Sequence, residues 1–294
     1  MVAAASDSFW QRLLSNFSFL FFIVLLLTWS TRPDGKLHIF FFDTPGDAFL
    51  LQTPNGQFIL LDGGADPTLL ALQLGRKLPF WQRKLDAILL TQNLSKCLPG
   101  QVAALARYQV KLALVCPNLA TANPSSQLDE WKRLLAQQKT KIRLAKPGDR
   151  LAFPMSQKNK ATKNQVLINV LLTGAAENSG GMVLRLDYGH FSMVFASATN
   201  EFDDEQLLKN AQPVTVLVYP WVREMDTKLM AGLKPRYILF SSLQESQEPA
   251  LLTYYEREAH YGSKLYHPSL DGTIELITNG LSLQIKTEKK ASKK

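Results

Sequence analysis

The first clear pattern along the chain is a long apolar stretch near the amino terminus. Residues 13–29 read LLSNFSFLFFIVLLLTW and include no charged residue. An α-helix of this length is about 25 Å long, near the short end of what crosses a bilayer. Trp10 and Trp29 flank the stretch, and tryptophan favours the membrane–water interface. The pattern therefore predicts one N-terminal membrane anchor over residues 1–32.

Two other interpretations of this stretch stay open. A cleaved signal peptide needs small residues at its cleavage site, but residues 28–33 read TWSTRP. A buried core helix would have a polar face, and none interrupts the run around Phe17 and Leu25. Arg12 favours a cytoplasmic amino terminus. We therefore expect a single-pass protein of the cell membrane whose soluble domain is extracytoplasmic.

Beyond residue 33 the pattern changes to short strands alternating with amphipathic helices. An Asn-Gly step at Asn55 predicts a hairpin turn between two of the strands. We predict strands over residues 37–42, 48–52, 58–61, 85–91, 111–116, 166–173, 182–187, 192–196, 214–219, 237–241, 273–278 and 282–286. We predict helices over residues 66–77, 100–108, 126–138, 203–210, 227–232 and 249–261. Two strand-rich halves with covering helices indicate an α/β (α+β) fold, a four-layer αββα sandwich.

Composition agrees with a folded domain and limits its chemistry. The 294 residues are 46% hydrophobic and 20% charged, which is typical of a globular protein. The chain has only two cysteines, Cys97 and Cys116. This number excludes a disulfide framework and a cysteine-rich zinc site. Pairing of the two thiols stays open, and we expect both to be buried as small apolar side chains.

Positive charge is concentrated in one segment. The formal net charge is +8, and residues 132–163 alone carry ten basic residues against one acidic residue. The basic residues are Lys132, Arg133, Lys139, Lys141, Arg143, Lys146, Arg150, Lys158, Lys160 and Lys163. Such a cluster predicts salt-sensitive binding to DNA phosphates. A solvated basic face and contact with anionic lipid are the alternatives.

Two early blocks carry a resemblance to a known family. Residues 42–51 read FDTPGDAFLL and residues 59–64 read ILLDGG. The motif residues in them are Asp43, Gly46, Asp47, Asp62, Gly63 and Gly64. Both blocks resemble the β-lactamase-like domain of ComEC, a protein of DNA uptake. Weaker similarity continues to residue 285. The resemblance implies a metallo-β-lactamase-like domain over residues 33–286, between the anchor and a basic tail over residues 287–294.

The resemblance also implies a metal site, and here the sequence departs from the family. Metallo-β-lactamase folds hold zinc or manganese through T-H-x-H-x-D-H, and neutral imidazoles and a carboxylate are needed to activate a metal-bound water. The matching residues 91–97 read TQNLSKC. Gln92 and Leu94 stand at the first two histidine positions, Lys96 at the aspartate and Cys97 at the last histidine. A lysine among the ligands would repel a cation.

Two later ligand positions are lost as well. Ala198 stands where the resemblance implies an aspartate, and Pro220-Trp221-Val222 matches a His-His-Gly step. The four histidines of the chain have no spacing typical of a metal site. We therefore expect no catalytic residue, no bound metal and no cofactor.

Three functional hypotheses follow. The first is a catalytically inactive, membrane-anchored subunit that has a structural role or binds a protein partner. Aromatic residues at 80–81 and 219–221, near the former metal site, are its expected exposed contacts. The second is a non-catalytic DNA-binding protein related to DNA uptake. The third is a hydrolase with a rearranged site, for example with Cys97 as nucleophile.

Overall fold

The computed structural model describes residues 16–18, 21, 33–92, 96–120, 125–153, 165–174, 180–241 and 249–289. The chain divides into two compact units, Met1–Asp34 and Gly35–Lys294. In the described part of the chain, no helix is both long and apolar enough to cross a membrane. The predicted anchor, including Trp10, Leu25 and Trp29, lies outside the described residues except at 16–18 and 21. Phe17, in that short piece, is exposed.

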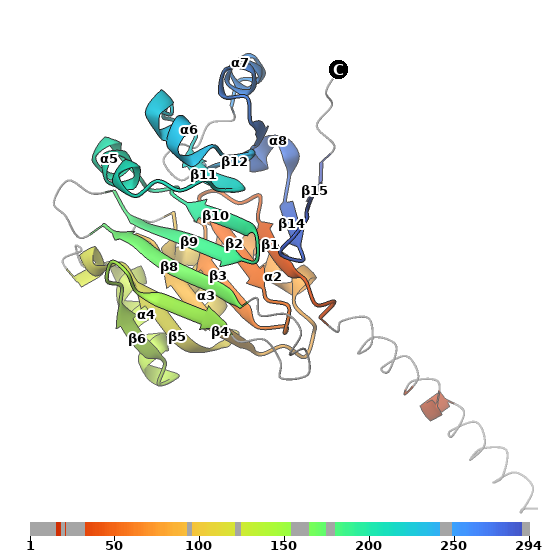
Figure 1. Ribbon diagram of the computed structural model, residues 1–294. Coiled ribbons are helices and arrows are strands. Elements are labelled where there is room, and N and C mark those ends of the chain that lie inside the picture. Colours follow the sequence, from red (N-terminus) through yellow and green to blue (C-terminus); the bar gives the residue numbers. More distant parts are fainter. Residues whose placement is uncertain are drawn as a thin grey trace, which may run out of the picture. The chain divides into compact units, whose positions relative to one another are not determined.

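The unit Gly35–Lys294 contains two β-sheets (Figure 1). The first sheet has eight strands in the order β15-β14-β1-β2-β3-β4-β5-β6. These strands are β1 (Leu37–Phe41), β2 (Ala48–Gln52), β3 (Phe58–Asp62), β4 (Lys84–Leu90), β5 (Gln109–Val115), β6 (Lys141–Leu144), β14 (Ile274–Thr278) and β15 (Leu283–Thr287). From β3 to β6 neighbouring strands are parallel. The inner strands β3, β4 and β5 of this part have long apolar runs, as expected for parallel strands covered on both faces.

The second sheet has seven strands in the order β13-β12-β11-β10-β9-β8-β7. They are β7 (Arg150–Phe153), β8 (Val166–Thr173), β9 (Met182–Tyr188), β10 (Phe191–Phe195), β11 (Val216–Pro220), β12 (Tyr237–Ser241) and β13 (Lys264–Tyr266). Strands β10 to β13 are parallel to one another, while β9 is antiparallel to β10. The amino end of β9 therefore lies beside the carboxyl end of β10.

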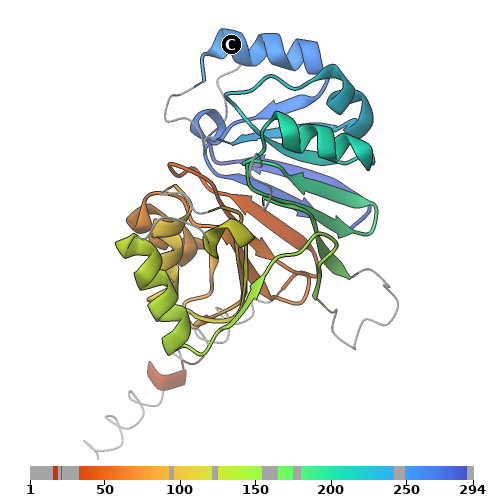
Figure 2. The same ribbon diagram turned by 90° about the vertical axis from the view of Figure 1, so that its left-hand side faces the viewer.

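Helices cover the outer face of each sheet. They are α2 (Pro67–Lys77), α3 (Leu98–Leu105), α4 (Ser126–Gln137), α5 (Glu201–Lys209), α6 (Thr227–Leu233), α7 (Leu251–Tyr261) and the one-turn α8 (Pro268–Asp271), with a 3₁₀ turn η1 (Pro117–Ala120). Figure 2 shows α2, α3 and α4 on one side of the sheets and α5, α6 and α7 on the other. The predicted four-layer αββα sandwich is confirmed.

An apolar core fills the space between the sheets. Aromatic side chains join its two halves: Phe41 stacks on Phe49 at 4.2 Å between ring centroids, and Phe49 meets the edge of Phe195 in the other sheet at 5.2 Å. All three side chains are buried. Aromatic pairs of this kind add to the free energy gained by burial alone. This core fixes the two sheets relative to each other and so places their strand ends.

The predicted elements agree with the observed ones to within about two residues at most ends. Strands β2, β8 and β12 have the predicted bounds. The main omissions are β6, β7, β13 and α8, which are three or four residues long. Such short elements leave too few positions for a period to be detected.

Candidate functional site

The carboxyl ends of the parallel strands in both sheets meet at one edge of the sandwich. Thr91 and Gln92 follow β4 on this edge, and Ala198 follows β10. The Met182 backbone N–H, at the amino end of β9, donates a 2.9 Å hydrogen bond to the Thr91 carbonyl. This bond joins one sheet directly to the other. Thr91, Gln92 and Ala198 are all buried, so the edge that the sequence predicted as a former metal site is closed.

Two glycines close this edge by direct backbone contact. A Cβ atom added at Gly181 would lie 2.5 Å from Ala198 Cβ and 3.3 Å from the Thr91 carbonyl oxygen. A Cβ atom added at Gly180 would lie 1.9 Å from the Ala198 carbonyl oxygen. Asp203 Oδ2 accepts a 2.8 Å hydrogen bond from the Gly180 N–H and thereby holds this segment against α5. Ala198 is therefore in direct contact with the backbone on the side that faces Gly180 and Gly181.

Asp62 lies beside this edge at the end of β3. It has φ +53°, in the left-handed region that non-glycine residues seldom adopt. Its carboxylate accepts hydrogen bonds from the Thr91 N–H at 2.9 Å and the Thr91 hydroxyl at 2.7 Å. Burial raises the pKa of Asp62 to about 7, with a smaller contribution from the charge of Asp47. Asp62 therefore orients Thr91, and through it the contact between the sheets.

The two family-motif blocks have structural positions around the start of α3. A Cβ atom at Gly46 would lie 2.2 Å from the Lys96 carbonyl oxygen, and one at Gly63 would lie 2.3 Å from the Gln101 nitrogen. The Gly64 N–H donates to the Asp47 carbonyl at 2.8 Å. Asp43 is peripheral and pairs with Lys289 at 2.9 Å. Glycine is therefore required at 46 and 63 for close packing.

Cys97 is unsuited to act as a nucleophile. Its side chain is fully buried at the start of α3. Burial raises the pKa of the thiol well above its usual value, and the nearby charges of Asp62 and Asp47 raise it further. Since the thiolate is the reactive form, this environment suppresses nucleophilic attack. Among the other lost ligand positions, Leu94 lies outside the described residues, and Lys96 is half-buried.

The prediction that the aromatic residues at 219–221 are exposed is wrong. Tyr219 is fully buried and Trp221 is 7% exposed. Trp221 packs edge-on against Phe240, with ring centroids 4.9 Å apart. Arg257 lies 4.3 Å over the Trp221 ring and donates to the Trp221 carbonyl. Trp221, which stands at the implied His-His-Gly step, is therefore part of the core, because its ring has apolar neighbours on the outer face of the second sheet.

Phe80 and Trp81 are exposed as predicted, at 65% and 40%. They lie between α2 and the amino end of β4. This is the opposite edge of the sheet from Thr91, so the expectation that they lie near the former site is wrong.

These residues do not fit a metal ion. Within the described ranges, no three histidine, cysteine, aspartate or glutamate side chains come close enough to hold one. At the edge itself the available groups are a glutamine amide, a lysine, a buried thiol of raised pKa and an alanine. A catalytic zinc site needs three good donors and an open position. We therefore derive no chemical step through a metal here.

Comparison with known proteins supports the fold and nothing finer. No protein-family model matches the chain, and no curated protein matches its sequence. Among solved structures, the metallo-β-lactamase fold protein YhfI from Bacillus subtilis aligns with a TM-score of 0.53 and 10% identity, over 78% of this chain and 96% of YhfI. A variant of the CmlA β-hydroxylase aligns with a TM-score of 0.52 and 14% identity, over 84% of this chain and 54% of the CmlA chain. The chain thus spans about half of CmlA. It has the metallo-β-lactamase fold.

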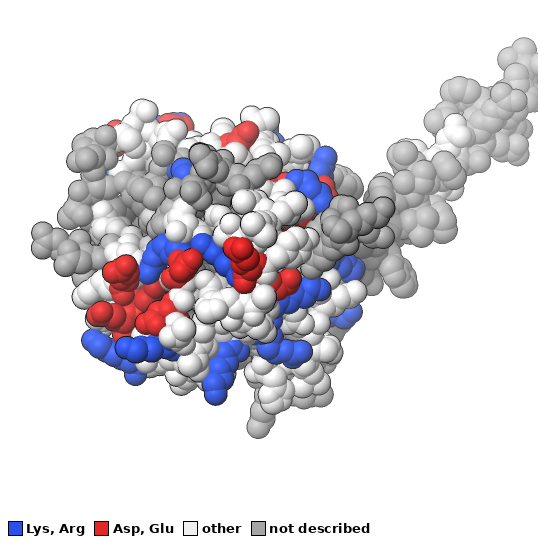
Figure 3. Space-filling view, turned by 90° about the horizontal axis from the view of Figure 1, so that it is seen from above, with Lys and Arg blue, Asp and Glu red and all other residues white. Residues whose placement is uncertain are grey.

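The sequence analysis missed an acidic pocket beside this edge. The pocket has a volume of about 790 Å³, and α5 and the segment after β11 contribute most of its lining. Its carboxylates are Glu201, Asp204, Glu205, Glu224 and Asp226. On the face that carries α5 to α7, acidic side chains gather in one area with basic side chains along the border (Figure 3). The run Glu201–Glu205 was the available signal, but a helix was the only feature predicted from it.

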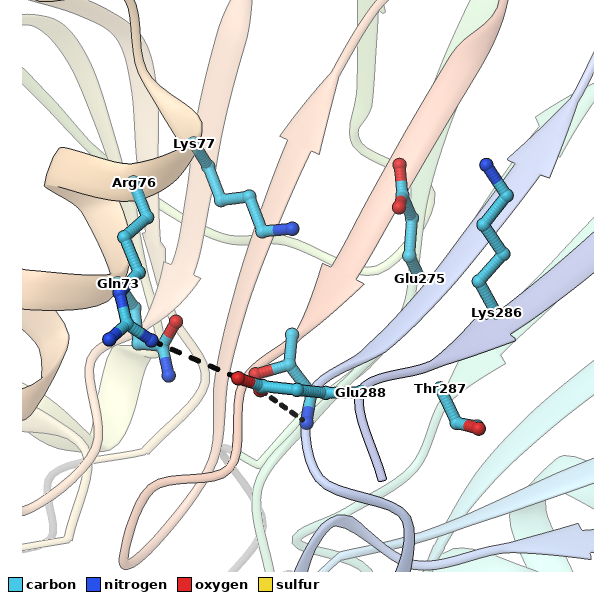
Figure 4. Close-up of a pocket in the computed structure, with 8 residues that line it drawn as sticks. Gln73, Arg76, Lys77, Glu275, Lys286, Thr287 and Glu288 are labelled. Carbon is cyan, nitrogen blue, oxygen red and sulfur yellow. Dashed lines mark hydrogen bonds and ion pairs between the residues drawn. The ribbon is translucent and has the colours of Figure 1, made fainter. Parts of the chain in front are cut away.

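A second pocket, of about 320 Å³, lies between α2 and the β14–β15 hairpin. Figure 4 shows Lys77 extending from α2 toward the side of the pocket that carries Glu275 and Lys286. Arg76 is 3.8 Å from Glu288, and Glu275 Oε1 is 2.9 Å from His38 Nδ1. Because its positive and negative charges nearly balance, this pocket selects no clear class of ligand.

The structure places most of the predicted DNA-binding residues on α4 and on or near the edge strand β6. Lys132, Arg133, Lys139, Lys141 and Lys146 are exposed there. Two of the predicted charges are partly neutralised, because Arg133 pairs with Glu130 and Arg143 with Asp149. Lys158, Lys160 and Lys163 lie outside the described residues.

The raised pKa of Asp62 predicts a pH-dependent effect of the substitution Asp62→Asn. The folded pKa of about 7 exceeds the ordinary value of 3.8. The stability that this group contributes is therefore complete below pH 4 and is lost as pH rises through 7. Asparagine resembles the protonated form of Asp62. The free energy of unfolding of Asp62→Asn, relative to that of the unsubstituted protein, should therefore be higher at pH 8 than at pH 5 by on the order of 2 kcal/mol. Urea unfolding at both pH values measures this gain, and a difference that is independent of pH would contradict the assignment.

The close backbone contact predicts opposite effects for two glycine-to-alanine substitutions. Gly181→Ala places a methyl group against Ala198 and should destabilise the fold by about 1–3 kcal/mol. Gly75→Ala is the matched control, because Gly75 lies on the exposed face of α2 with nothing within 4 Å of an added Cβ. It should stabilise the protein by about 0.5–1 kcal/mol. Denaturant unfolding of both variants checks the pair, and an unchanged midpoint for Gly181→Ala would refute the closed edge.

Proposed function

We propose that this chain is a non-catalytic protein of the metallo-β-lactamase fold that binds a protein partner at a membrane. The observation that carries the proposal is the direct packing of Gly180 and Gly181 on Ala198 and Thr91. Catalysis in this fold requires an open position on a metal ion at that edge. Here the backbone of Gly180 and Gly181 packs against Ala198, at the position where the resemblance implies a metal-binding aspartate.

The preserved parts of the fold support a binding role. The sheets, the covering helices and the motif turns around Asp47 and Gly63 are intact, whereas the groups needed for hydrolysis are absent from the described part of the edge. Such a domain offers partners its surface and no reaction. The apolar stretch over residues 13–29 supports attachment to a membrane, with the domain on the extracytoplasmic side.

The proposal predicts that the full chain does not retain a catalytic metal. After incubation with zinc or manganese and removal of the unbound ions, the metal content of detergent-solubilised protein should stay far below one ion per chain. Elemental analysis of the protein peak measures this. One or two tightly held ions per chain, together with hydrolysis of a phosphodiester or β-lactam substrate, would overturn the proposal.

DNA binding is a second candidate, favoured by the exposed lysines of the α4–β6 region. The resemblance to ComEC gives it a biological setting, since that family handles incoming DNA. Binding of this kind depends on phosphate neutralisation and has little preference for sequence. It is compatible with a closed metal edge.

If this region binds DNA, affinity should fall steeply with salt. A triple variant should weaken binding and reduce the slope of log K against log[salt] by roughly three units, about 0.9 for each phosphate that the variant no longer neutralises. The substitutions are Lys132→Gln, Lys139→Gln and Lys141→Gln. Fluorescence anisotropy with labelled duplex and single-stranded DNA measures both quantities.

A charge-matched triple variant on other surfaces is the control for this experiment. Its substitutions are Lys84→Gln, Lys209→Gln and Lys228→Gln, all at exposed positions. This variant should keep most of the slope. Equal reductions of the slope in the two variants would show that only net charge matters and would argue against a DNA site on α4 and β6.

A further inference from the structure

The acidic pocket is built by the two segments that follow lost ligand positions. Glu201, Asp204 and Glu205 lie on α5, just after Ala198. Glu224 and Asp226 follow Trp221, after β11. The segments that the family resemblance associates with metal ligands therefore present carboxylates on the outer side of the second sheet.

Four of these carboxylates are not neutralised by an ion pair with a described residue. Glu201, Glu205, Glu224 and Asp226 are exposed, and none of them forms an ion pair with a residue in the described ranges. The whole chain carries a net charge of +8. A local excess of negative charge attracts cations.

Arg223 does not neutralise the pocket, because its guanidinium group is already bound. It donates to Asp204 Oδ2 at 2.6 Å and to the Thr199 carbonyl at 2.9 Å. It also lies 5.4 Å from the centre of the Tyr219 ring. These contacts fix Arg223 against the protein and commit its charge to Asp204.

Asp204 provides a second and independent indication of a ligand. Its side chain is only 9% exposed although it lines the pocket. The Tyr219 hydroxyl and Arg223 both donate to Oδ2, while Oδ1 is buried without a hydrogen-bond partner among the residues described. Burial raises the pKa of this carboxyl group. A buried carboxylate oxygen that lacks a donor is costly, and a cationic ligand in the pocket would reduce that cost.

The shape of the pocket favours an extended cation over a single ion. Its carboxylates are too dispersed for three of them to hold a metal ion together. Its volume, about 790 Å³, is also far larger than one ion requires. Leu208, Val222 and Met225 add apolar lining, which suits the aliphatic stems of lysine and arginine. His260 offers an imidazole to backbone carbonyls, and a peptide has such carbonyls whereas a polyamine does not.

We propose that this pocket binds a lysine- and arginine-rich segment of a partner protein. The inference rests on the proposed binding function and names the chemistry of the partner. Charges on α5 and on the segment after β11 would pair with successive basic side chains. Each exposed pair contributes little, but several pairs in one pocket select a segment with clustered positive charge.

Anisotropy titrations of the full chain in detergent with a short labelled peptide of alternating arginine and glycine test this proposal. The double variant Glu201→Gln/Glu205→Gln removes two pocket charges and should weaken binding roughly fivefold to tenfold. Glu224→Gln should weaken it by a smaller factor. A peptide with glutamine in place of arginine should not bind.

The matched control is Asp129→Asn/Glu130→Gln on α4, which changes the net charge by the same amount on the opposite side of the sandwich. It should leave the affinity for the arginine peptide within about twofold. Equal weakening in both double variants, or no binding by the unsubstituted chain at low salt, would overturn the proposal. Binding of spermine at the pocket without binding of the peptide would overturn it as well.

Metal analysis of the same samples separates this proposal from the function on which it rests. Stoichiometric metal with pocket-dependent peptide binding would contradict the non-catalytic assignment and support the pocket. No metal and no pocket-dependent binding would overturn the pocket assignment alone.

Discussion

The hydrogen bond between the Met182 N–H and the Thr91 carbonyl is the interaction on which the rest of this structure depends. It joins the two sheets at their carboxyl edge, where related folds hold a metal ion between the layers. The bond forms because Gly180 and Gly181 let the backbone approach Ala198 without a side chain between them. A catalytic metal would need an open coordination position, whereas at this edge the glycine backbone packs directly against Ala198.

Closing the edge changes the electrostatics around it. Without a cation, a buried carboxylate depends on protein donors or on a proton. Asp62 accepts hydrogen bonds from Thr91 and has a raised pKa. Asp203 accepts one from the Gly180 N–H, and Asp204 accepts hydrogen bonds from Tyr219 and Arg223. Negative charge that the protein does not neutralise lies farther out, on α5 and the segment after β11. The edge at Thr91 and the acidic pocket are therefore neighbours in this fold.

Much of the fold follows from the sequence because the period of apolar residues is a local property. The elements missed, such as β6 with its sequence KIRL, are short and charged. The lost ligand positions were also readable, because each is a single residue in a motif. The burial of Trp221 and the acidic pocket could not be predicted from the sequence. Trp221 is buried by Phe240 and Arg257, and Glu205 and Glu224 line the same pocket, so both features depend on parts of the chain that are distant in sequence.

Amide hydrogen exchange at Met182 tests the central claim most directly. If the edge is closed by the backbone, the Met182 N–H should exchange as slowly as the amides in the centre of β9, and neither a chelator nor added zinc should change its rate. Fast exchange at Met182, or protection that arises only when zinc is added, would contradict the account. Either result would mean that the two sheets are not joined at this point and that the edge is open to a metal ion.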